Sequence, residues 1–69
     1  MTKKEKSNHI TMTILDMLKE HNIQDKSLFL SDISSIICIF DTDVAIETMN
    51  NFGTEGKEQA LSIKINYGY

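Results

Sequence analysis

Apolar residues in the first third of the chain recur at the spacing of an α-helix. The spacing i, i+4, i+7 and i+8 places four side chains along one side of a helix, with charged residues elsewhere on its circumference. The four side chains are Ile10, Ile14, Met17 and Leu18. This pattern predicts a helix in the first third of the chain.

The two ends of this first helix carry recognisable capping residues. Ser7 can cap its start, and Thr2 with Glu5 has the spacing of a capping box that starts the helix earlier. Asn22, which follows His21, tolerates the left-handed conformation that closes a helix. We therefore expect the helix to end near these two residues. Its N-cap is either Thr2 or Ser7.

The segment from Ser27 to Phe40 has two interpretations. Residues 27–30 are short and apolar, which suits a brief strand, and Ser31 can then cap a helix with apolar residues at i, i+3, i+4 and i+7. The same apolar run, residues 36–40, is rich in β-branched side chains and also suits a buried strand. Periodicity favours the helix over residues 34–40, and intrinsic propensity favours the strand.

The rest of the chain predicts one more helix and a final strand. Thr42 or Asp43 can cap a helix that runs to Asn50, and Gly53 can close it. Residues 54–57 are polar and predict a loop. From residue 60 to 67 apolar and polar positions alternate with period two, with Leu61, Ile63, Ile65 and Tyr67 on one face. That alternation predicts a half-buried strand.

Together these elements predict an α+β fold in one small domain, residues 1–69. The expected order is an N-terminal helix, a short strand, two helices and a C-terminal strand. Residues 1–6, which contain three lysines, are predicted to form a mobile basic arm.

Residues 30–44 resemble the helix-turn-helix pattern of bacterial and phage regulators. An apolar residue precedes a small one at Ile33 and Ser34, Cys38 and Ile39 stand at the turn, and the β-branched Val44 lies inside the second helix. With its flanking elements, the chain is similar to a reduced winged helix-turn-helix. That resemblance implies DNA binding, yet the corresponding recognition helix, Thr42 to Asn50, contains acids and no lysine or arginine.

Length and composition indicate that the chain needs an additional source of stability. With 69 residues it forms one domain, whose core rarely supplies more than roughly 3–5 kcal/mol. One cysteine makes no internal disulfide, and one cysteine with two histidines falls short of a structural zinc set. We therefore expect self-association, as a homodimer.

The sequence also favours a cytoplasmic protein. Asp16 and Lys19 interrupt the apolar residues that follow the basic start, so a signal peptide is not expected. The longest apolar run, residues 36–40, is too short to cross a bilayer. The chain has no arginine against seven lysines and ten isoleucines, a bias that AT-rich codons produce. This bias suggests a low-GC bacterium or its phage as the source.

Charge is distributed unevenly along the chain. The net charge is −3, but residues 27–56 contain five acids and no lysine. Such a segment repels phosphate groups and suits a basic protein partner. The residues we expect at a partner-binding surface are Asp41, Asp43, Glu47, Phe52, Tyr67 and Tyr69.

No residue pattern predicts catalysis, a metal site or a cofactor. Cys38 lies in an apolar run, where a thiol is usually inert. His9 and His21 are too far apart on a helix to act together, and the pair Asp41 and Asp43 has no further ligands at metal-binding spacing. The sequence predicts a non-enzymatic regulator or inhibitor that binds a protein through an acidic surface. The alternative is a winged helix-turn-helix regulator that contacts DNA with its lysines.

Overall fold

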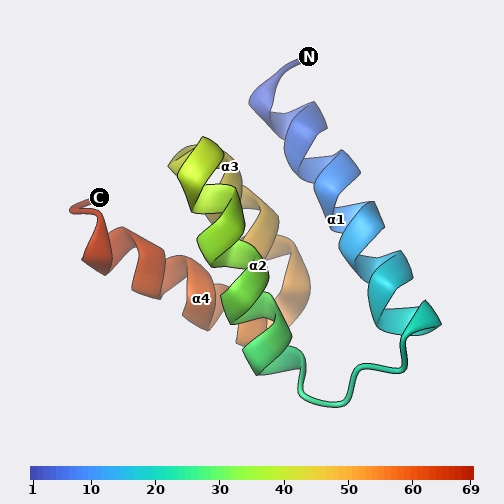
Figure 1. The fold of residues 1–69 in the computed structure, drawn as a ribbon. Coiled ribbons are helices and arrows are strands. Elements are labelled where there is room, and N and C mark those ends of the chain that lie inside the picture. The colour runs from blue at the N-terminus through green and yellow to red at the C-terminus, as the bar shows by residue number, and fades with distance from the viewer.

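The computed structural model describes all 69 residues and contains helices only (Figure 1). Four α-helices and one short 3-10 helix follow one another: α1 (Lys3–Glu20), α2 (Lys26–Phe40), α3 (Thr42–Met49), η1 (Asn50–Phe52) and α4 (Gly53–Asn66). The predicted α+β class is therefore wrong, because neither residues 27–30 nor residues 60–67 form a strand.

Helix α1 begins at the earlier of its two predicted starts. The Thr2 hydroxyl accepts a hydrogen bond from the Glu5 backbone N–H, and the Glu5 carboxylate accepts one from the Thr2 N–H, each at 3.1 Å. This capping box builds residues 3–6, assigned to a mobile arm above, into the first turns of the helix. Asn22 has a φ of 48°, in the left-handed region that was expected after the helix.

Helix α2 starts five residues before the predicted cap at Ser31. Asp25 caps it, with a side-chain oxygen that accepts a hydrogen bond from the Leu28 N–H at 3.0 Å. The cap draws residues 27–30 into the helix, where Leu30 continues the helical spacing of the buried residues Ser34 and Ile37. The helical interpretation of residues 34–40 is confirmed, and the strand alternative is wrong.

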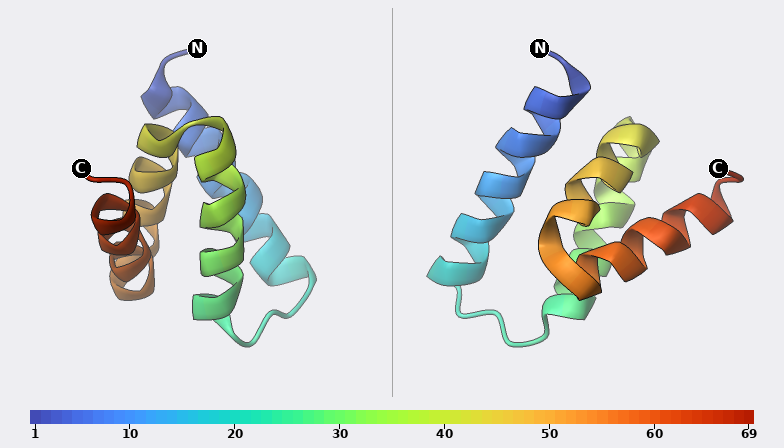
Figure 2. Two further views of the ribbon diagram at one scale, coloured as in Figure 1. Left: turned by 60° about the vertical axis from the view of Figure 1, so that its left-hand side comes forward. Right: turned by 180° about the vertical axis from the view of Figure 1, so that it is seen from behind.

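Helix α3 is the predicted third helix, and it lies at the centre of the fold. Its N-cap is Asp41, one residue before the two predicted caps, and this single residue joins it to α2. Five of its eight residues are buried: Val44, Ala45, Ile46, Thr48 and Met49. Seen from behind, α3 lies between α1 and α4, with α2 on the far side (Figure 2).

Helix α4 replaces both the predicted loop at residues 54–57 and the predicted strand at residues 60–67. Gly53, with φ 69° and ψ −147°, turns the chain through a conformation that is essentially restricted to glycine. The buried residues of α4 are Gly56, Ala60 and Ile63, at i, i+4 and i+7. Gly56 and Ala60 are too small to stand out as hydrophobic positions in the sequence, and the larger Leu61 and Ile65 are exposed.

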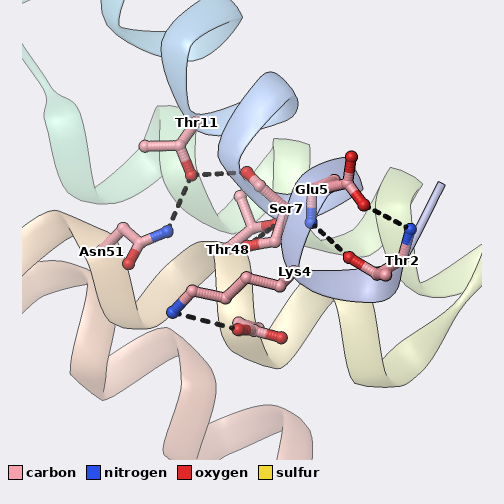
Figure 3. A network of polar contacts seen from close by, with 8 residues as sticks. Thr2, Lys4, Glu5, Ser7, Thr11, Thr48 and Asn51 are labelled. Atoms are coloured by element: carbon pink, nitrogen blue, oxygen red, sulfur yellow. Dashed lines mark hydrogen bonds and ion pairs between the residues drawn. The ribbon is translucent and has the colours of Figure 1, made fainter.

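A polar seam joins α1 to α3 and η1 (Figure 3). It consists of three side-chain pairs: Lys4 with Glu47, Ser7 with Thr48, and Thr11 with Asn51. The central pair is fully buried, and the Thr48 hydroxyl donates to the Ser7 hydroxyl at 3.3 Å. Both buried hydroxyls have a partner, as buried polar groups require. The seam therefore fixes how α1 lies against α3.

Candidate functional site

The acidic residues predicted to bind a partner are held by lysines of α1. The Lys3 ammonium donates to an Asp43 carboxylate oxygen at 2.6 Å and lies 3.6 Å from Asp41. One turn further along α3, Glu47 lies 3.6 Å from Lys4. The three acids thus gather on one side of α3, but two lysines from the start of the chain offset much of their charge. Sequence reasoning treated those lysines as a separate arm and so missed the pairing.

The ion pair changes the titration of its members. Lys3 holds the pKa of Asp43 below its ordinary value, and Asp43 in turn raises the pKa of Lys3. Asp43 also raises the pKa of the Tyr69 hydroxyl, mainly by accepting its hydrogen bond. The last residue of the chain therefore lies beside the start of α3, together with the start of α1.

We expect the Lys3→Met substitution to raise the pKa of Asp43 toward its ordinary value, because Lys3 is the main cause of the lowered pKa. A lowered folded-state pKa stabilises the fold above the unfolded carboxyl pKa, and the contribution is lost as the pH falls through the folded-state pKa. The variant should therefore lose less stability on acidification. Side-chain NMR titration of Asp43 measures this shift, with Lys57→Met as the control. An unchanged Asp43 pKa in Lys3→Met would contradict the assignment.

The six predicted partner-binding residues do not form one surface. Asp41, Asp43 and Tyr69 lie near the start of α3, and Glu47 lies one turn further along the same helix. Phe52 lies beyond the other end of α3, half-buried against the core. Tyr67 caps the end of α4 and is 56% exposed.

Sequence reasoning missed an apolar groove between α1 and α2. Both helices pack against α3 and diverge from each other, so a cavity of about 450 Å³ opens between them. Eight of the eleven residues that line it are hydrophobic, and Val44 of α3 is among them. We call this cavity the α1–α2 groove.

Each wall of the groove carries a stripe of residues spaced i, i+4, i+7 and i+11. On α1 the stripe is Lys6, Ile10, Thr13 and Met17, and on α2 it is Phe29, Ile33, Ile36 and Phe40. All of these except Phe29 line the groove. The alternation of steps of four and three is the spacing with which helices pack along each other in bundles and coiled coils. The α2 stripe is apolar throughout, whereas the α1 stripe combines the apolar Ile10 and Met17 with the polar Lys6 and Thr13.

Helix α2 exposes apolar side chains on the side toward the groove. Phe40 is 82% exposed and Ile36 is 53% exposed, although both lie in the longest apolar run of the chain. Only Lys26 and Asp32 are charged among its 15 residues. A helix that is apolar around most of its circumference is normally covered, and an exposed apolar patch commonly marks an interaction surface.

A second, smaller cavity of about 180 Å³ lies between α2 and α4 and is lined mainly by polar residues. Four of them are serines: Ser31, Ser34, Ser35 and Ser62. Cys38 borders this cavity, and burial raises the pKa of its thiol. The sulfur thus stays protonated at neutral pH, which does not suit a nucleophile. Nor does the fold bring three histidine, cysteine, aspartate or glutamate side chains together in a cluster that could hold a metal ion.

None of the helices combines the length and the apolar character needed to span a bilayer. Comparison of the chain with protein families, with curated proteins and with solved structures finds no match. The geometry of the α1–α2 groove is therefore the basis on which a function is proposed.

Proposed function

We propose that the protein is a small non-enzymatic regulator or inhibitor that acts by docking helices of a protein onto the α1–α2 groove. The observation that carries this proposal is the pair of matched stripes on the two walls. Protein binding is the class of function that the sequence predicts. The surface that binds the partner is now the groove and not the acidic residues. Asp41, which lines the groove, connects the two surfaces.

The dimensions of the groove suit helical ligands. The residues that line the groove run from Lys6 to Met17 on α1 and from Ile33 to Phe40 on α2. At a rise of 1.5 Å per residue these walls are roughly 16 Å and 10 Å long, or three and two turns of helix. Helices that dock in grooves typically use three anchors, at i, i+3 or i+4, and i+7. Burying an exposed apolar side chain such as Phe40 contributes about 1.5–3 kcal/mol. A few such anchors are enough for specific binding.

The alternative function, DNA binding, uses the lysines of the first turns. Two of them, Lys3 and Lys4, form ion pairs with carboxylates of α3 and are therefore partly neutralised as phosphate ligands. No observation favours this alternative over the groove.

A capture experiment with matched variants tests the proposed function. Wild-type protein, Ile36→Asp and Ile65→Asp are immobilised and exposed to a lysate of the source cells, and bound proteins are identified by mass spectrometry. Ile36 lines the groove and is 53% exposed, while the control Ile65 is the same residue type on α4 and is 71% exposed. We expect wild type and Ile65→Asp to capture the same protein and Ile36→Asp to capture at least about tenfold less, as the loss of one anchor predicts. Equal capture by all three forms would contradict docking in the groove.

A further inference from the structure

We draw no further inference here: the strongest candidate, the apolar α1–α2 groove on which the proposed function already rests, carries nothing more because nothing in the structure shows what covers it.

Discussion

The substitution Gly56→Ala is expected to lower the free energy of unfolding by at least about 1–3 kcal/mol, a large part of the stability of this small domain. A Cβ atom at this position would lie 2.0 Å from the Met49 carbonyl oxygen and 2.6 Å from the Phe52 Cβ. The first contact is with the backbone of α3, so it is relieved only by moving α4 away from α3. Overpacking of a core costs about 1–3 kcal/mol when side chains can adjust, and here a backbone atom must move. A domain of this size has roughly 3–5 kcal/mol to lose.

Far-UV circular dichroism in a urea series measures this effect. Lys57→Ala is the matched control, because it changes the next residue of the same helix at an exposed position. The control should keep the wild-type urea midpoint to within the few tenths of a kcal/mol typical of surface changes. A Gly56→Ala variant with the wild-type midpoint would show that α4 does not approach α3 as described.

Leu30→Ala is expected to lower the free energy of unfolding by about 2–5 kcal/mol, as truncation of a fully buried leucine does. Leu30 is 1% exposed and belongs to the core cluster, so its loss leaves a cavity. Leu28→Ala is the control: the same substitution, two residues earlier in the same helix, at a position that is 60% exposed. Urea unfolding of both variants gives the difference directly. Equal destabilisation of the two would mean that residues 27–30 do not have the helical orientation described here.

The sequence correctly predicted the helices whose large apolar residues face the core. It failed for α4 because Leu61, Ile63 and Ile65 alternate as in a strand, and only Ile63 is buried. The real contact surface of α4 uses Gly56 and Ala60, whose burial comes from close helix packing and leaves no hydrophobic pattern. The period-two alternation was overridden by tertiary contact, which a single sequence does not show.

The sequence did not predict the α1–α2 groove, for a different reason. The helical spacing of Ile10 with Ile14 was visible in the sequence, but spacing alone does not show which apolar side chains a neighbouring helix leaves uncovered. That the two helices diverge follows from how each packs on α3, and for α1 this depends on hydroxyl and amide pairs such as Ser7 with Thr48. Polar pairs 41 residues apart in the chain have no periodic signature. The ion pair of Lys3 with Asp43 was missed for the same reason.

Helix α3 depends for its stability on the helices that pack on it. An isolated helix of eight residues is not stable in water, since helix initiation costs more than so few hydrogen bonds return. Helix α3 therefore exists only while its neighbours surround it, and α1, α2 and α4 all pack on it. A fragment that lacks α1, α2 or α4 therefore loses part of the contact surface that keeps α3 helical. Such a fragment should thus unfold as a whole, with no protease-resistant core left behind.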